Sequence, residues 1–161
     1  MNKLKIDIYL NIVLVVSLIS IISAYFIEYV LGHQPCNLCL IERIPYILSI
    51  ILIILNYLTK NQLFIILLLI LVFSFSLILS MYHFGIEQGF FDESAVCGLN
   101  NTSEIISKEE LLKQLQVKSI SCKDVTFRIF GFSLTTFNII LSLIIIVSLI
   151  KIFKNYEKFK K

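Results

Sequence analysis

Charged residues are scarce in this chain, and that scarcity sets its broad class. Asp, Glu, Lys and Arg make up 16% of the 161 residues, whereas hydrophobic residues make up 58%. A soluble domain of this length cannot cover so much apolar surface with so few charged side chains. The solvent around the folded chain must therefore include lipid.

Four segments contain no Asp, Glu, Lys or Arg: residues 8–27, 44–59, 61–86 and 129–150. A helix needs about 20 apolar residues to cross a membrane. Three segments reach that length, and residues 38–41 can extend the second. None shows the alternation of a membrane β-barrel. The sequence predicts an all-α membrane protein, a bundle of four transmembrane helices at about 8–29, 41–59, 62–84 and 129–150.

The chain shows no internal repeat or low-complexity tract, so we expect one membrane domain over 1–161, with outer loops at about 30–40 and 85–128. The first apolar segment has the basic start of a signal peptide, Lys3 and Lys5. It exceeds the usual core of about 7–15 residues, and no small-residue cleavage site follows. We expect it to stay in place as the first membrane helix.

The distribution of Lys and Arg predicts the orientation. With four crossings, both termini and the turn at 59–62 share one side, which carries eight basic residues. The other side carries six, spread mainly over the loop 87–128 among seven acids. The basic segment after residue 150 weighs most, so we expect cytoplasmic termini and outward-facing longer loops.

All four cysteines then fall on the outer side, Cys36 and Cys39 in the first loop and Cys97 and Cys122 in the second. This placement fits an oxidising compartment. Two structural disulfides would explain the second pair, which closes a long loop. They explain the first pair badly, because a bridge across two residues removes little unfolded-chain entropy. Cys-x-x-Cys is the usual spacing of redox-active dithiols, so we favour a redox role for Cys36 and Cys39.

Metal binding is the alternative use of such a pair. Structural zinc sites commonly combine two close pairs of ligands, but Cys97 and Cys122 are separated by 24 residues. Both histidines, His33 and His83, look poorly placed along the chain to replace that pair. Covalent haem attachment requires a histidine at the position of Leu40. We therefore expect no metal site.

The residues around Cys39 favour a reactive thiol. Pro35 and Pro45 both suit a first helical turn, so the second helix should begin between them, with Cys39 near its start. Arg43 follows Cys39 by four residues, a spacing that puts both on one helical face. We expect the guanidinium to stabilise a Cys39 thiolate and to donate to a ligand oxygen, although Arg43 would also suit simple anchoring at lipid headgroups.

Three stretches together resemble a known family. "PCNLCLIER" at 35–43, "YHFGIEQGFF" at 82–91 and "FRIFGFSLTTFN" at 127–138 are similar to the bacterial DsbB family of disulfide bond formation proteins, as are the four helices with one cysteine pair in each outer loop. The resemblance covers roughly residues 8–150. It implies a protein of the bacterial inner membrane that oxidises thiols at the expense of a quinone, ubiquinone or menaquinone.

The resemblance also implies roles for individual residues. A soluble DsbA-like thioredoxin-fold partner would deliver electrons to the Cys97–Cys122 disulfide, with Cys97 forming the mixed disulfide. Cys122 would then connect to Cys36, and Cys39 would face the quinone with Arg43 assisting. His83 matches a histidine that lies near the quinone in the family, although a histidine at a helix end also suits the membrane interface.

The second outer loop contains one further predicted element. "SKEELLKQL" carries a possible capping box at Ser107 and Glu110 and a leucine face ending at Leu115, which predicts a short amphipathic helix on the membrane surface.

A relative of vitamin K epoxide reductase would also combine Cys-x-x-Cys with a quinone, but usually late in the bundle. A non-catalytic bundle with structural loop disulfides is the remaining alternative.

Overall fold

The computed structural model describes residues 3–59, 61–92, 97, 121–123, 127–129 and 131–160. Four helices are long and apolar enough to cross a membrane, which confirms the predicted all-α four-helix class. The amphipathic helix predicted from Ser107 to Leu115 lies outside the described residues. The elements are, in order, α1 (Lys3–Tyr29), α2 (Asn37–Ile41), α3 (Ile44–Thr59), α4 (Gln62–Glu87), β1 (Arg128–Ile129), β2 (Phe132–Ser133) and α6 (Leu134–Lys160).

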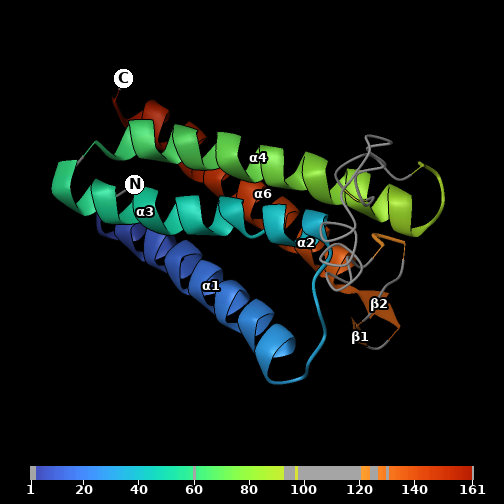
Figure 1. Ribbon diagram of the computed structural model, residues 1–161. Helices are drawn as coiled ribbons and strands as arrows, with labels where there is room; N and C mark the ends of the chain where they lie inside the picture. Colours follow the sequence, from blue (N-terminus) through green and yellow to red (C-terminus); the bar gives the residue numbers. More distant parts are fainter. Residues whose placement is uncertain are drawn as a thin grey trace, which may run out of the picture.

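The helices form a bundle in which α3 contacts α1 and α4, and α4 contacts α6 (Figure 1). Both termini and the connection between α3 and α4 lie at one end of the bundle, which we call the terminal end. The helix α2 and the hairpin of β1 and β2 lie at the opposite end, which we call the cysteine end. This arrangement follows from four successive crossings of the bundle.

The core of the bundle is built from apolar side chains of all four long helices. Ile53, Leu69, Phe73 and Leu149 are fully buried in it. Many outward-facing side chains are equally apolar but exposed, as expected for helices whose neighbours are lipid chains. Since lipid is as apolar as leucine, close packing and a few polar contacts must hold the helices together.

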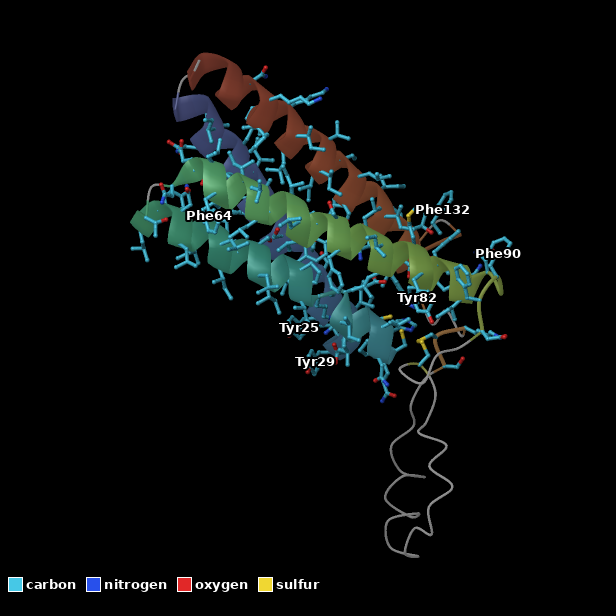
Figure 2. The ribbon with its side chains drawn as sticks, turned by 90° about the horizontal axis from the view of Figure 1, so that it is seen from above. Tyr25, Tyr29, Phe64, Tyr82, Phe90 and Phe132 are labelled. Atoms are coloured by element: carbon cyan, nitrogen blue, oxygen red, sulfur yellow. A yellow bond between two sulfur atoms is a disulfide. The ribbon has the colours of Figure 1, made fainter. Side chains whose placement is uncertain are left out.

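Aromatic side chains mark the boundary of the apolar zone at the cysteine end. Tyr25 and Tyr29 stack on each other near the end of α1, and Tyr29 is 75% exposed. Figure 2 shows Phe90 and Phe132 at the same end of the molecule, and Phe64 toward the opposite one. Exposed tyrosines are typical of the membrane–water interface, so the cysteine pairs lie close to that interface.

The second membrane segment is split into α2 and α3, where the sequence predicts one helix. Pro45 explains the break. It has no N–H to donate to the carbonyl of Ile41, and its ring would clash with that carbonyl in a continuous helix. The backbone therefore turns at Glu42 and Arg43 before α3 begins.

The end of α4 is shaped by two glycines. Gly89 adopts a positive φ of 78°, which a residue without a Cβ reaches without strain. The chain then folds back, and the amides of Phe90 and Phe91 both donate to the carbonyl of Gly85. A Cβ at Gly85 would collide with the Phe91 ring. The motif at 82–91 thus ends the helix in a compact turn and fixes the direction of its last residues.

The fourth membrane helix begins at Leu134, later than the predicted 129, because a two-stranded hairpin precedes it. Gly131 sits in the turn with a φ of 87°, a conformation that favours glycine. Ser133 ends the hairpin and caps α6: its Oγ accepts the amide of Thr136 at 3.4 Å. The hairpin brings the start of α6 against the end of α4.

Candidate functional site

Cys36 and Cys39 lie side by side at the start of α2. Cys36 is the residue that caps this helix, and its Sγ accepts the backbone amide of Cys39 at 3.3 Å. The two Sγ atoms are 2.7 Å apart, and both cysteines are free thiols. Cys36 is buried, whereas Cys39 is partly exposed. The structure therefore holds the Cys-x-x-Cys pair as a neighbouring dithiol.

The donors that stabilise a negative charge converge on Cys36, not on Cys39 as the sequence predicted. Cys36 precedes the membrane-spanning segment Asn37–Thr59. A hydrogen bond from the Cys39 thiol lowers the pKa of Cys36 to about 4; His83 and the Cys39 amide add to the shift, and burial opposes it. The main physical cause is the adjacent Cys39 thiol, and the amide at the N-cap position makes a smaller contribution.

His83 is the third member of this group. Its Nε2 lies 3.5 Å from Cys36 Sγ, and its Nδ1 lies 2.9 Å from Glu42 Oε1. The ring is 2% exposed. A carboxylate at Nδ1 fixes the imidazole orientation and leaves Nε2 directed at the sulfur. His83 can therefore exchange a proton with the Cys36 thiol.

Glu42 links this histidine to α6. Its Oε2 accepts Asn138 Nδ2 at 2.9 Å, and Asn138 also donates to Ser80 Oγ at 2.7 Å and accepts from Tyr46. A buried carboxylate is costly unless its oxygens are satisfied, and here both are. The network thus supports Glu42 as an ordered anion beside His83.

Glu87 is a second buried acid on the same side of α4, four residues after His83. Its Oε1 accepts Thr135 Oγ1 at 2.5 Å and lies 3.8 Å from His83 Nε2. Its Oε2 is buried and has no hydrogen-bond partner among the described residues. An unsatisfied buried oxygen at a cavity is a natural contact for a bound polar group.

Arg43 points toward α1. Its Nη1 donates to Glu28 Oε2 at 2.6 Å, and its guanidinium lies 5.0 Å from the centre of the Tyr25 ring. The sequence predicted that Arg43 lies on one helical face with Cys39; in the structure its guanidinium pairs with Glu28. Arg43 still lines the same cavity as Cys36 and Cys39.

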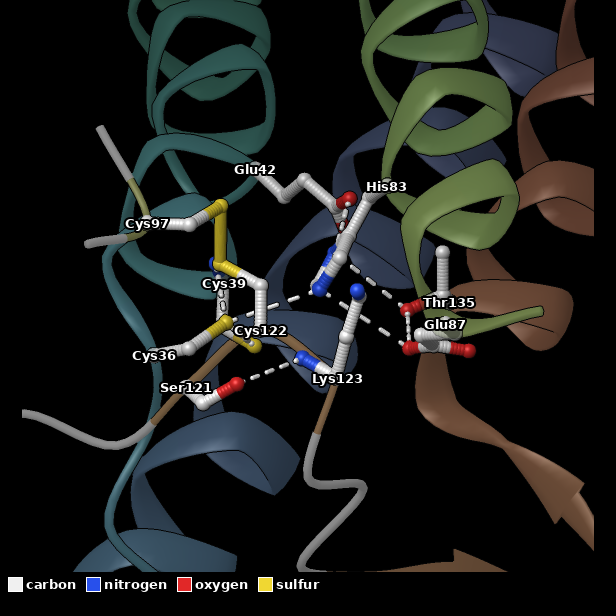
Figure 3. The surroundings of a disulfide bond; sticks show 10 residues. All are labelled: Cys36, Cys39, Glu42, His83, Glu87, Cys97, Ser121, Cys122, Lys123 and Thr135. Carbon is white, nitrogen blue, oxygen red and sulfur yellow. Dashed lines mark hydrogen bonds and ion pairs between the residues drawn. A yellow bond between two sulfur atoms is a disulfide. The ribbon is translucent and has the colours of Figure 1, made fainter. Parts of the chain in front are cut away.

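Cys97 and Cys122 form a disulfide, the pairing expected for the second loop. Both are buried and belong to one apolar cluster with Cys36 and Ile86. Figure 3 shows this disulfide beside Cys36 and Cys39, with His83 on the far side of the pair. The fold therefore brings the cysteines of both loops to one place.

A cavity of about 440 Å³ opens beside the dithiol. Its polar lining includes Cys39, Arg43, His83 and Glu87, and its apolar lining comes mainly from α1 and α6, including Ile19, Ile27, Phe137, Ile140 and Leu141. Pockets for small molecules commonly span about 300–1,000 Å³. The cavity suits a molecule with a polar ring and an apolar tail.

His83 lies much closer to Cys36 and Cys39 than the sequence predicted. His83 looks distant along the chain, yet Cys36 Sγ, Cys39 Sγ and His83 Nε2 all lie within 4.8 Å of one another. The bundle folds the end of α4 against the start of α2, which no linear spacing reveals. His33 lies apart from this group, against the ring of Phe127 at 5.0 Å.

Sequence reasoning missed several polar residues of the site: Glu28, Glu42 as the partner of His83, Glu87, Thr135 and Asn138. A usable signal existed for three of them. Thr135 and Asn138 are polar residues in an apolar segment, and Glu87 follows His83 by one helical turn. Polar residues inside membrane helices usually face the bundle interior and carry function.

Comparison with known proteins agrees with this geometry. Residues 7–152 match the family described as disulfide bond formation protein DsbB. The chain belongs to the DsbB family. An uncharacterized protein of Rickettsia prowazekii (strain Madrid E) is 34% identical, over 92% of this chain and 90% of the relative. No solved structure matches the chain.

Membership of the DsbB family fixes the broad function as disulfide bond formation, by a thiol–disulfide oxidoreductase in a membrane. It favours the redox interpretation of Cys36 and Cys39 over a purely structural bundle. It also favours DsbB over the vitamin K epoxide reductase alternative, in agreement with a Cys-x-x-Cys pair that opens the second membrane segment.

Proposed function

We propose that the protein reoxidises a soluble DsbA-like thiol oxidase outside the inner membrane and passes the electrons to a membrane quinone. The observation that carries this proposal is the position of the Cys36–Cys39 dithiol. It packs against the Cys97–Cys122 disulfide of the outer loop and lines a largely apolar cavity within the helices. The pair is thus next to a disulfide that can pass electrons to it and next to a site for a lipid-soluble oxidant.

The residues of the cavity fit a quinone. A quinone has two carbonyl oxygens on a flat ring and an isoprenoid tail. Arg43 and His83 supply N–H donors, and apolar side chains such as Ile140 line much of the remainder. When bound, a quinone accepts two electrons and two protons and leaves as a quinol.

Electron flow through the cysteines follows thiol–disulfide exchange. A thiolate of the reduced partner attacks Cys97, giving a mixed disulfide that the partner's second thiolate resolves. This oxidises the partner and leaves Cys97 and Cys122 as a dithiol. Cys122 then attacks Cys36 of the Cys36–Cys39 disulfide, and attack by Cys97 on that mixed bond restores Cys97–Cys122. The first-loop pair is now the dithiol that the cavity oxidant must reoxidise.

His83 accepts the proton that Cys36 releases, and Glu42 stabilises the protonated His83. When Cys36 acts as a thiolate, its proton can move to His83 Nε2, 3.5 Å away. Glu42, 2.9 Å from Nδ1, stabilises the resulting imidazolium and holds the ring in place. The two protons required for quinol come from the two thiols, so the overall step balances.

The orientation in the membrane is part of this proposal. The terminal end carries the basic residues after 150, and positive residues favour the cytoplasm. The cysteine end would then face the periplasm. Reporter fusions after residue 161 should read cytoplasmic and insertions near residue 100 external; an external C-terminus would place every cysteine on the wrong side.

The decisive experiment combines the purified protein, a quinone and a reduced thioredoxin-fold partner. Quinone loss, followed by absorbance, should match the number of partner disulfides formed one to one. Cys36→Ser should abolish quinone loss. Cys97→Ser should block oxidation of the partner but still allow a small dithiol to drive quinone reduction through Cys36–Cys39. Normal partner oxidation by Cys97→Ser would show that electrons enter elsewhere, and no quinone loss with the unaltered protein would overturn the proposal.

A further inference from the structure

Three metal-ligating atoms meet at the site, two sulfurs and one nitrogen. Cys36 Sγ lies 2.7 Å from Cys39 Sγ and 3.5 Å from His83 Nε2. Tetrahedral zinc with Zn–S of about 2.3 Å and Zn–N of about 2.0–2.1 Å separates sulfur from nitrogen by about 3.5 Å and two sulfurs by about 3.8 Å. The distance between Cys36 Sγ and His83 Nε2 already fits. The sulfurs must move apart by about 1 Å, within reach of a small change in the Cys39 side-chain torsion.

The surroundings of His83 also suit a metal ligand. Metal-bound histidines almost always donate the second ring N–H to a carboxylate or carbonyl, which fixes the tautomer. Here Glu42 Oε1 lies 2.9 Å from Nδ1, and Asn138 holds the other oxygen of Glu42. With its proton on Nδ1, the ring presents the lone pair of Nε2 to the two thiols.

Two carboxylates, those of Glu42 and Glu87, lie beside His83. Glu87 Oε1 lies 3.8 Å from His83 Nε2, and its Oε2 has no hydrogen-bond partner in the described part of the chain. The cavity beside Cys39 leaves room for a water or a carboxylate oxygen as the fourth ligand. Thiolate and imidazole ligands select Zn²⁺ or Cd²⁺ over Mg²⁺ or Ca²⁺.

We propose that, in the reduced protein, Cys36, Cys39 and His83 bind a soft divalent cation such as Zn²⁺, and that bound metal withdraws the pair from thiol–disulfide exchange. The metal displaces the protons that the ligand atoms still hold, and no electrons move. The disulfide form has no thiolate to offer, so oxidation of the pair and metal binding exclude each other. The inference does not depend on which oxidant or partner the protein uses.

Spectroscopy on the full-length chain tests the site directly. In a Cys97→Ser/Cys122→Ser background, Cys36 and Cys39 are the only thiols. The reduced protein in detergent, freed of reductant, is titrated with Co²⁺. We expect one tetrahedral cobalt per chain with thiolate-to-metal charge-transfer bands, displaced by Zn²⁺ and absent after oxidation of the pair. Cobalt binding without those bands, or equal binding by the oxidised protein, would overturn the site.

Variants then test the individual ligands. Glu42→Gln should weaken Co²⁺ binding about 10- to 100-fold, the usual cost of losing a carboxylate behind a metal-bound histidine. His83→Ala should weaken it at least as much. The matched control is His33→Ala, since His33 lines the same cavity outside the ligand group. Equal affinities of His83→Ala and His33→Ala would exclude His83 as a ligand.

The unaltered chain provides a test that does not depend on the folding of variants. In membranes treated with reductant, alkylation of Cys36 and Cys39 is followed by mass spectrometry. Zn²⁺ should slow it at least tenfold and Mg²⁺ should not; equal rates with and without Zn²⁺ would refute the inference. Neither quinone nor partner is added, so this outcome is separate from that of the quinone assay.

Discussion

The two ends of the bundle use the same helices in different ways. At the terminal end, residues such as Leu69 and Leu149 pack in an apolar core. The polar contacts there are separate pairs, as between Gln62 and Asp7 at 2.6 Å, and among the described residues they do not form a connected network. At the cysteine end, buried Glu42 and His83 belong to a connected network that spans three helical segments. The difference teaches that packing along the helices secures the fold, while costly buried polar groups are gathered where thiols react.

The largest contrast between the two ends should come from a cysteine. Cys36→Ser removes the sulfur that accepts the Cys39 amide and faces His83. We expect quinone reduction to fall to the uncatalysed background, because the electron path through this pair is lost. Thermal unfolding should change little. Steady-state turnover and a melting curve on the same preparation measure both.

Leu69→Ala is the opposite case in the apolar core. It should lower the free energy of unfolding by roughly 1–3 kcal/mol, at the low end of core truncations because lipid replaces water in the unfolded reference. Turnover at a temperature below unfolding should stay near normal. A loss of turnover as severe as in Cys36→Ser would break the division between the two ends.

Arg43 should give the next largest effect. If it donates to the quinone oxygen, Arg43→Ala should raise the apparent KM for quinone about 10- to 100-fold, since a charge-assisted hydrogen bond contributes about 1.5–3 kcal/mol. Arg43→Lys keeps the charge but loses the planar fork, so it should be impaired less. Partner exchange at Cys97 should be unaffected, and quinone titrations measure the difference.

Glu28→Gln is the control for Arg43, because Glu28 accepts Arg43 Nη1 at 2.6 Å. If Arg43 acts only by joining the second segment to α1, Glu28→Gln should reproduce the defect of Arg43→Ala. A direct contact with quinone predicts a much smaller defect. Unchanged quinone kinetics in both Arg43 variants would end its assigned role.

Glu42→Gln should have a smaller effect, about tenfold on turnover, because the amide keeps one acceptor but loses the charge that stabilises protonated His83. The matched change at the terminal end is Asp7→Asn, which also converts a hydrogen-bonded carboxylate to an amide. Asp7→Asn should leave turnover unchanged. Equal defects in the two variants would mean that Glu42 serves only the packing of the bundle.

The smallest effect concerns pH. The pKa of Cys36 is lowered to about 4, so its thiolate is fully present above about pH 5 and is lost only as the pH falls through that value. The alkylation rate of Cys36 in the reduced protein should change less than about twofold between pH 6 and 8, because the thiol is already ionised over this range. Site-resolved mass spectrometry measures the rate.

A cysteine at the terminal end sharpens this comparison. Leu58 is 75% exposed, and Leu58→Cys introduces a thiol without the donors that surround Cys36. Its alkylation rate should rise roughly tenfold per pH unit over the same range, as for an ordinary thiol. A Cys36 rate that rises equally steeply would show that the surrounding donors leave its thiol unperturbed.

The sequence alone determined the class of fold and the residues that carry sulfur chemistry. Long uncharged segments require membrane helices, because lipid offers no partner for backbone N–H and C=O groups. The Cys36–Cys39 spacing indicated a redox pair, and the ordered motifs identified the DsbB family. These are properties of local composition and spacing, which survive without knowledge of how the helices pack.

Only the tertiary structure decided which groups touch. Arg43 pairs with Glu28 on α1, and Cys36 caps α2 and accepts the Cys39 amide, contacts that the spacing of Cys39 and Arg43 does not predict. His83 reached Cys36 across 47 positions of sequence. Contacts of this kind depend on the rotation and depth of each helix against its neighbours. Those are set by side-chain packing over the whole bundle, which the spacing along a single segment does not encode.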